Sequence, residues 1–204
     1  MLSLILSCVE SEALDEPIRL NVIGGPCEGC ETIVHGMPST LAHRGVIAPE
    51  SEPGQRMMIA GRVLDESGEP VEGVIVYAYH TDQGGIYPRS EDGHRHGRLR
   101  GWVVSDAAGE YAFDTIRPGG YPSSSAPAHV HMHLIEPGGC SYYIDDIFFT
   151  DDPRLTESMR RTHERSRGGS GVITPEEEGG DGSIVARRDI VLGANVPGYD
   201  RCAD

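Results

Sequence analysis

The sequence has few basic residues: 17 Lys and Arg stand against 32 Asp and Glu in 204 residues, which gives a formal net charge of −15. A nucleic-acid partner requires a basic stripe that replaces the counterions of the phosphates, and the sequence has no such stripe. The acidic residues are spread along the chain and form no tail, so we interpret them as a solvated surface. We therefore expect no nucleic-acid partner.

Long hydrophobic runs are also missing, because nothing in the chain approaches the ~20 apolar residues of a membrane span. Residues 1–8 resemble the last part of a bacterial lipoprotein signal, with Ser7 before Cys8. They lack a basic n-region, and their apolar run is shorter than an ordinary signal core. A truncated signal with a lipidated Cys8 and an accidental likeness both stay open, and with them a cytoplasmic or an exported location.

Cysteine is scarce and irregularly spaced. Of the five cysteines, only Cys27 and Cys30 form a C-x-x-C pair. A structural zinc site would need a second such pair, and a thioredoxin-like motif would need a βαβ setting, neither of which the sequence offers. We expect a disulfide or inert thiols at this pair, and both alternatives stay open.

The length and composition favour one substantial domain. Residues 1–55 are rich in Gly, Pro, Ser and Glu without sustained periodicity, so we expect an irregular N-terminal arm, followed by the domain over residues 56–204. Short β-like runs between turn residues predict an all-β fold, an antiparallel β-sandwich. The expected strands cover residues 57–64, 74–80, 101–105, 110–113, 129–135, 142–149 and 183–192. One short helix is expected up to Arg161, with Asp152 as N-cap and Pro153 in the first turn.

Three histidines alternate with apolar residues in the segment from Ala128 to Leu134. Period-two alternation places His129, His131 and His133 on one face of the expected strand. Imidazole is the commonest ligand of first-row transition metals, and two imidazoles at i and i+2 can hold one ion when the backbone is extended. The pattern predicts a metal site on a β-sheet, without selecting the metal.

Two Gly-rich segments each deliver a tyrosine. Tyr87 follows Gly84-Gly85-Ile86, and Tyr121 stands in the segment Gly119-Gly120-Tyr121-Pro122. A free phenol has a pKa of roughly 10, so only a strongly Lewis-acidic ion holds tyrosinate at neutral pH. Two tyrosines together with two histidines therefore favour Fe³⁺ over Zn²⁺ or Mg²⁺.

These motifs together resemble those of the intradiol ring-cleavage dioxygenases, the family of protocatechuate 3,4-dioxygenase and catechol 1,2-dioxygenase. The resemblance covers roughly residues 57–153. Its most specific part is Gly-x-Tyr-Pro at residues 119–122, followed closely by Pro-Ala-His-x-His at residues 127–131. This combination is far less frequent by chance than a lone His-x-His.

The resemblance implies a non-haem ferric dioxygenase that cleaves a catechol-type ring between its two hydroxyls with O₂ and gives a muconate-type diacid. It implies that a single ferric ion is held by Tyr87, Tyr121, His129 and His131. Tyr121 matches the catalytic tyrosinate that leaves the metal when substrate binds and accepts a proton. The expected partners are a small catechol-type substrate and O₂, and a homo-oligomer stays open. No external reductant is implied, which agrees with the lack of a nucleotide-binding glycine fingerprint.

Two positions depart from the family pattern. Ala126 stands where an Arg usually precedes the Pro-Ala-His-x-His segment, and Asp146 aligns with a position that is usually Gln. The loss of a cation and the gain of a carboxylate change the electrostatics around an anionic substrate, so a carboxylated catechol is disfavoured. The candidates for a replacement cation are Arg98, Arg100, Arg187 and Arg188.

Other residues of these types have simpler interpretations. No family ligand falls at His133, so we expect it beside the ligands or on the surface. We expect His94 and His96 to be solvated in a polar loop. The side chains expected to pack in the fold or line a cavity are Tyr77, Tyr79, Tyr111 and Trp102.

The main alternative is a non-catalytic sandwich. Two motifs of this chain also occur in prealbumin-like and carboxypeptidase-regulatory modules, which bind ligands or act as spacers: Gly-x-Val-x-Asp near residue 61 and Asp-x-x-Gly-x-Tyr-x-Phe near residue 106. These modules do not account for Gly-x-Tyr-Pro with His-x-His, so we rank this hypothesis second. A two-histidine cupin-like zinc or iron enzyme without tyrosinate ligands ranks third.

Overall fold

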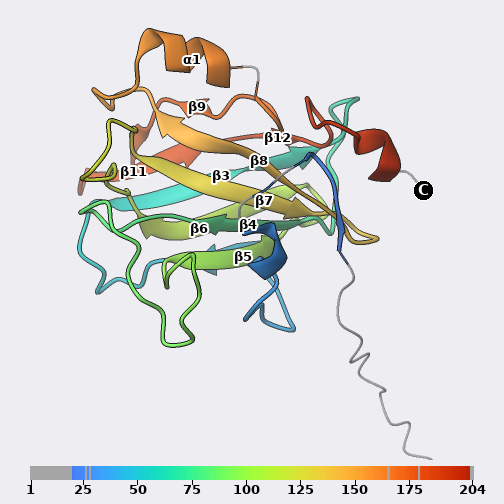
Figure 1. The fold of residues 1–204 in the computed structure, drawn as a ribbon, viewed down its shortest axis with the longest axis horizontal. Coiled ribbons are helices and arrows are strands. Elements are labelled where there is room, and N and C mark those ends of the chain that lie inside the picture. The colour runs from blue at the N-terminus through green and yellow to red at the C-terminus, as the bar shows by residue number, and fades with distance from the viewer. Residues whose placement is uncertain (1–19, 26, 28, 165, 179, 203–204) are drawn as a thin grey trace, which may run out of the picture.

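Two β-sheets packed face to face form the body of the protein (Figure 1). The structure is a computed structural model that describes residues 20–25, 27, 29–164, 166–178 and 180–202. The signal-like segment with Cys8 lies outside these residues. The predicted all-β sandwich with a short helix is confirmed.

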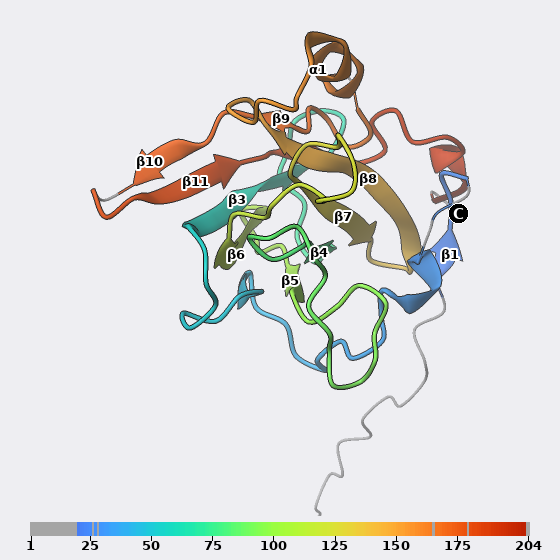
Figure 2. The same cartoon turned by 60° about the vertical axis from the view of Figure 1, so that its left-hand side comes forward.

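The first sheet has the strand order β1-β8-β7-β4-β5, with β9 beside β8. Its strands are β1 (Asn21–Val22), β4 (Ile75–Tyr79), β5 (Arg100–Val104), β7 (His129–Ile135), β8 (Cys140–Phe149) and β9 (Val172–Ile173). The second sheet has the order β10-β11-β3-β6-β2, with β12 beside β3. Its strands are β2 (Arg44–Val46), β3 (Arg56–Leu64), β6 (Glu110–Ile116), β10 (Glu176–Glu178), β11 (Ser183–Arg187) and β12 (Ile190–Val191). Figure 2 shows the β10–β11 hairpin projecting from the sandwich.

Strand direction differs between the centre and the edges of the sheets. The central pairs β3–β6, β4–β5, β4–β7 and β7–β8 are antiparallel, and a short turn joins β7 to β8 as a hairpin. The peripheral strands add parallel pairs: β1 and β9 with β8, β2 with β6, and β11 and β12 with β3. The sheets are therefore mixed. Two short strands precede residue 56: β1 joins the first sheet and β2 joins the second.

The last expected strand, residues 183–192, is interrupted. The structure divides it into β11 and β12, and Arg188 lies between them with 1% of its surface exposed. The Arg188 backbone N–H donates to the carbonyl of Ala60, and the Tyr111 hydroxyl donates to the Arg188 carbonyl. The alternation of buried and exposed side chains nevertheless continues through the break, because Arg188 is buried between the exposed residues Arg187 and Asp189.

The helix begins later than the sequence predicts. Helix α1 spans Glu157–His163, and the Thr156 hydroxyl accepts the N-cap hydrogen bond from the Met159 N–H. Asp152 does not cap it, because one carboxylate oxygen accepts from the Arg154 N–H and the other from the Ala128 N–H. Asp152 therefore fixes the residue before the histidine strand. Within the described residues, no helix has the length and apolarity that crossing a bilayer requires.

The main core lies between the two sheets. Val130, Met132 and Leu134 point inward from β7 with 0 to 1% exposure, and they belong to one cluster with Ile59 and Phe113 of the second sheet. A smaller apolar cluster covers the outer face of the first sheet. Its buried members are Ile33, Tyr77, Tyr79 and Ile135. The predicted burial of Tyr77, Tyr79 and Tyr111 is confirmed, and all three are at most 8% exposed.

Candidate metal centre

Strand β7 carries His129, His131 and His133 on its outer face, as the alternation predicts. His129 and His131 are half-buried, whereas His133 is 3% exposed. Cross-strand pairing sets Tyr79 of β4 opposite His131, and the two rings stack with centroids 4.6 Å apart. The outer face of the first sheet is thus a surface of aromatic rings.

Glycine lets the two tyrosine-bearing loops come together. Gly85 has φ +79°, and a Cβ at this residue would lie 2.2 Å from the Gly120 carbonyl oxygen. A side chain at residue 85 would therefore force the loops apart. Their contact brings the Tyr87 and Tyr121 hydroxyl oxygens to 2.8 Å from each other.

Four donor atoms converge at this point. The Tyr121 hydroxyl oxygen lies 3.1 Å from His129 Nε2 and 3.4 Å from His131 Nε2. With the Tyr87 hydroxyl oxygen, it completes a set of two phenol oxygens and two imidazole nitrogens. The structure therefore brings together all four residues that the sequence singles out as ligands.

The second nitrogen of each imidazole has its own acceptor. His129 Nδ1 lies 2.7 Å from the Pro127 carbonyl oxygen, and His131 Nδ1 lies 2.8 Å from an Asp146 carboxylate oxygen. These acceptors require N–H at Nδ1, which leaves the lone pair on each Nε2, toward the phenols. Burial lowers the pKa of His129, so its ring is neutral at pH 7. This is the tautomer that a metal ligand requires.

The phenols also fit a strong Lewis acid. Burial, and then the hydrogen bond with Tyr121, raise the pKa of Tyr87 well above its ordinary value. The Tyr87 phenol is thus held as a neutral hydroxyl unless a cation compensates the buried charge. A strongly Lewis-acidic transition-metal ion would compensate such charge beside the two imidazoles.

A β-bulge positions Asp146. Val130 pairs with Ile147 and Met132 pairs with Ile144, so Asp145 and Asp146 of β8 both lie opposite His131. The extra residue turns the Asp146 carboxylate toward the His131 ring. Burial alone would raise the pKa of Asp146, but the electrostatic attraction of the His131 imidazole and the hydrogen bond that this ring donates hold the pKa below its usual value.

The four candidate replacement cations do not line the cavity. Arg98 pairs with Glu52 at 2.5 Å, Arg100 with Asp92 at 2.6 Å and Arg187 with Glu176 at 3.8 Å. Arg188 is buried and donates from one guanidinium nitrogen to the Asp145 carbonyl and from another to the Arg167 carbonyl. It stabilises the bulge from the core side.

A cavity of about 470 Å³ adjoins the donor set. Its polar lining residues include Tyr87, Arg95, His96, Tyr121, His131, His133, Tyr143 and Asp146, and Cys27 also lines it. Arg95 contributes a guanidinium to the cavity lining, and this group lies 3.4 Å from a Glu31 carboxylate oxygen. Sequence reasoning missed Arg95, because its loop reads as solvated and no motif marks it.

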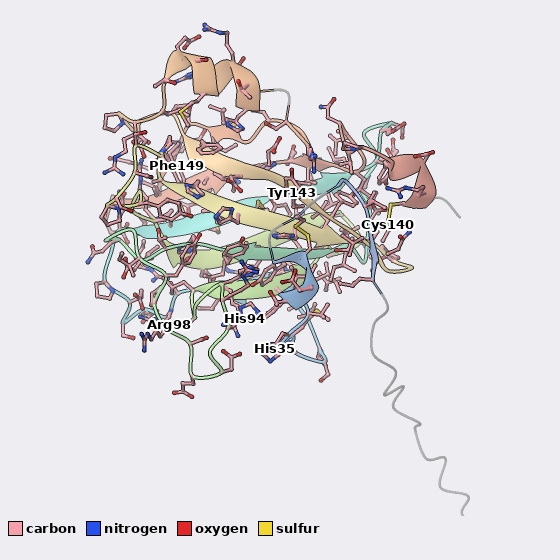
Figure 3. All side chains as sticks on the ribbon, viewed as in Figure 1. His35, His94, Arg98, Cys140, Tyr143 and Phe149 are labelled. Atoms are coloured by element: carbon pink, nitrogen blue, oxygen red, sulfur yellow. A yellow bond between two sulfur atoms is a disulfide. The ribbon has the colours of Figure 1, made fainter. Side chains whose placement is uncertain are left out.

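The prediction of solvated loop histidines is wrong. His94 and His96 are 7% and 4% exposed, because their loop folds back onto the outer face of the first sheet. His96 stacks on Tyr79 with centroids 3.9 Å apart, and its Nδ1 lies 2.9 Å from the Tyr77 hydroxyl. His94 stacks on His35 (Figure 3). Trp102 is half-buried and its indole N–H donates to the Ile33 carbonyl.

Two disulfides are formed. Cys27 pairs with Cys30, which settles the alternative that the sequence leaves open. Cys140 pairs with Cys202 across 62 residues and ties the start of β8 to the 3₁₀ helix η2 (Tyr199–Cys202) (Figure 3). The sequence gives no signal for this second pair.

A family model described as Dioxygenase matches residues 34–167, which is most of the chain. The chain therefore belongs to the dioxygenase family, and the resemblance to intradiol ring-cleavage enzymes is confirmed. The match favours an enzyme over the non-catalytic sandwich modules.

Named relatives agree with this membership. The protocatechuate 3,4-dioxygenase beta chain of Burkholderia cepacia is 33% identical over 112 residues, which are 50% of this chain and 48% of the relative. Chlorocatechol 1,2-dioxygenase of Rhodococcus opacus is 31% identical over 144 residues, 60% of this chain and 52% of the relative. The chain thus spans about half the length of these relatives.

Solved structures share the fold. Catechol 1,2-dioxygenase of Acinetobacter sp. ADP1 matches with a TM-score of 0.61 at 19% identity, over 81% of this chain and 61% of that one. The dioxygenase domain of a carbohydrate-binding fusion from Streptomyces sp. SirexAA-E matches with a TM-score of 0.57 at 21% identity, over 76% of this chain and 91% of that one.

Proposed function

We propose that this chain is an intradiol ring-cleavage dioxygenase that opens a catechol-type ring between its two hydroxyls with O₂ and yields a muconate-type diacid. The observation that carries the proposal is the convergence of two phenol oxygens and two imidazole Nε2 atoms beside a cavity. A prealbumin-like binding module has no need for such a donor set.

The proposed cofactor is one ferric ion held by Tyr87, Tyr121, His129 and His131. When bound, Fe³⁺ would accept both oxygens of the diol as ligands and make its ring reactive toward O₂. The oriented imidazoles suit a transition-metal ion, and the two adjacent phenols support Fe³⁺ over Zn²⁺.

Tyr121 has the position that proton transfer requires. Its hydroxyl oxygen lies within 3.4 Å of the other three donor groups, and its loop borders the cavity. We assign it the catalytic role, in which the phenolate oxygen accepts a proton from a substrate hydroxyl. Tyr87, His129 and His131 keep the substrate oriented, and the Asp146 carboxylate holds the His131 ring.

The electrostatics of the cavity favour an uncharged catechol. The Asp146 carboxylate lies at the donor set, and Ala126 brings no cation to it. Arg95 is the cationic side chain among the lining residues, and its ion pair with Glu31 offsets part of its charge. We therefore propose catechol or hydroxyquinol as substrate, in preference to protocatechuate.

Oxygen uptake by the iron-loaded protein tests the proposal. We expect catechol and hydroxyquinol to consume one O₂ per diacid formed, and protocatechuate to react more slowly. The protein should be reddish from tyrosinate-to-iron charge transfer, and Tyr87→Phe or Tyr121→Phe should shift this band, while Tyr111→Phe, distant from the donors, should not. Tight catechol binding without O₂ uptake would instead establish a binding module. A colourless iron-loaded protein would refute the tyrosinate ligands.

A further inference from the structure

A second group of metal-ligating atoms lies at another wall of the same cavity. The Sγ atoms of Cys27 and Cys30 lie 3.9 Å and 3.7 Å from His133 Nδ1. Cys27 and His133 both line the cavity, whereas Cys30 is 4% exposed. None of the three belongs to the proposed ferric ligand set, and the Tyr79 ring stacks on both His131 and His133.

These atoms are held in place from both sides. Gly29 has φ +85°, and a Cβ there would lie 2.3 Å from His96 Nε2, so the turn before Cys30 packs directly on the His96 ring. The following 3₁₀ helix η1 (Cys30–Thr32) is tied to β5 by the Trp102 indole N–H, which donates to the Ile33 carbonyl. His133 is fixed within β7. These contacts hold both sulfurs beside the imidazole in the disulfide form.

We propose that reduction of the Cys27–Cys30 disulfide creates a Cys₂His site for a thiophilic divalent cation such as Zn²⁺. A tetrahedral zinc with bonds of about 2.3 Å to sulfur and about 2.0 Å to nitrogen sets its sulfur and nitrogen ligands about 3.5 Å apart. The two observed separations are 3.7 Å and 3.9 Å. Only the two sulfurs have to move apart, to about 3.8 Å.

The disulfide form cannot bind the cation, because neither sulfur carries a thiolate charge. An external dithiol supplies two electrons and two protons: the Cys27–Cys30 bond breaks, two thiols form, and the dithiol becomes a disulfide. Binding of the cation then releases both thiol protons. Three protein ligands leave a fourth position, and two of these ligands, Cys27 and His133, line the cavity. The site is thus open to water or to an anionic oxygen, as in Cys₂His zinc enzymes.

Cobalt(II) titration of the full chain tests this site, before and after treatment with a dithiol that is then removed without air. A thiolate-to-cobalt charge-transfer band reports sulfur ligation, which the tyrosine and histidine donors cannot give. We expect one additional equivalent of Co²⁺ with this band in the reduced protein only, and its displacement by Zn²⁺. No band in the reduced protein would overturn the proposal.

Variants assign the ligands. The reduced Cys27→Ser/Cys30→Ser protein should lack the band, and because it retains Cys8 and the other pair, an unchanged band would refute the site. The matched control is Cys140→Ser/Cys202→Ser, which should keep the band. If the band disappears in this control and not in the first variant, the cation binds at Cys140 and Cys202, and the proposal is refuted. His133→Gln should weaken Co²⁺ binding by more than about tenfold, since even the loss of an outer partner has this effect. Unchanged affinity would exclude His133.

Discussion

The two faces of strand β7 differ in what covers them. The inward residues Val130, Met132 and Leu134 are sealed against the second sheet with at most 1% exposure. The outward residues His129 and His131 are half-buried under loops that carry glycine and tyrosine. One strand therefore supplies both stability and chemistry, and the pleat separates the two by a single residue. A substitution on one face should leave the property of the other largely unchanged.

The largest effect is expected on the core face. Phe113→Ala in β6 removes a ring with 0% exposure and should lower the free energy of unfolding by about 3–5 kcal/mol, because it leaves a cavity between the sheets. Urea denaturation measures this loss. Iron content per folded protein should stay at the level of the unsubstituted chain, and a parallel loss of iron in protein that is still folded would show that the two faces are coupled.

The converse substitution is on the outer face. His131→Ala should weaken Fe³⁺ binding by at least about 100-fold, beyond the usual effect of an outer partner, and change unfolding by no more than about 1 kcal/mol. Metal analysis after dialysis against a chelator gives the first quantity, and urea denaturation gives the second. His35→Ala, on the stacked pair with His94, is the matched control and should retain iron.

A buried histidine outside the ligand set predicts acid sensitivity. His80 is 0% exposed, its Nδ1–H donates to the Thr81 carbonyl, and burial lowers its pKa to about 4. In the unfolded chain the pKa is about 6.5, so the unfolded state takes up the proton first as the pH falls. Stability should decrease by about 2.5 kcal/mol between about pH 6.5 and pH 4. In His80→Gln this slope should diminish, and an equal slope would assign it to other groups.

The smallest effect is expected at the bulge. Asp146→Asn keeps a side-chain acceptor for the His131 N–H but removes its charge, so iron affinity should fall by about tenfold. The visible charge-transfer band should shift while the protein remains coloured. Asp145→Asn, the neighbouring bulge residue, whose carboxylate accepts from the Arg167 N–H, provides the comparison and should leave the band in place.

Local sequence patterns were sufficient for the central strands β3 to β8, and they singled out the candidate ligands. Period-two alternation located β7, and the Gly-flanked Tyr87 and Tyr121 identified the loops that meet it. Family motifs added the pairing of these tyrosines with His129 and His131. Each of these signals lies within a few consecutive residues.

What the sequence could not provide depends on distant contacts. Asp146 faces His131 only because a bulge adds a residue to β8, and alternation alone gives no sign of it. The polar composition around His96 predicts a solvated loop, whereas stacking on Tyr79 buries it. Asp152 and Thr156 are both good N-caps, and only the hydrogen bond from Ala128 to Asp152 decides between them.

The buried Arg188 also bears on the order of events during synthesis. Its guanidinium contacts the carbonyl of Asp145, the residue before Asp146, from a point 43 residues later in the chain. A nascent chain emerges from its N-terminus, so β7 and β8 leave the ribosome before the cation that braces their bulge. Until residue 188 is available, the carboxylate beside His131 lacks this support. A residue translated late therefore completes the setting of a histidine made nearly 60 residues earlier.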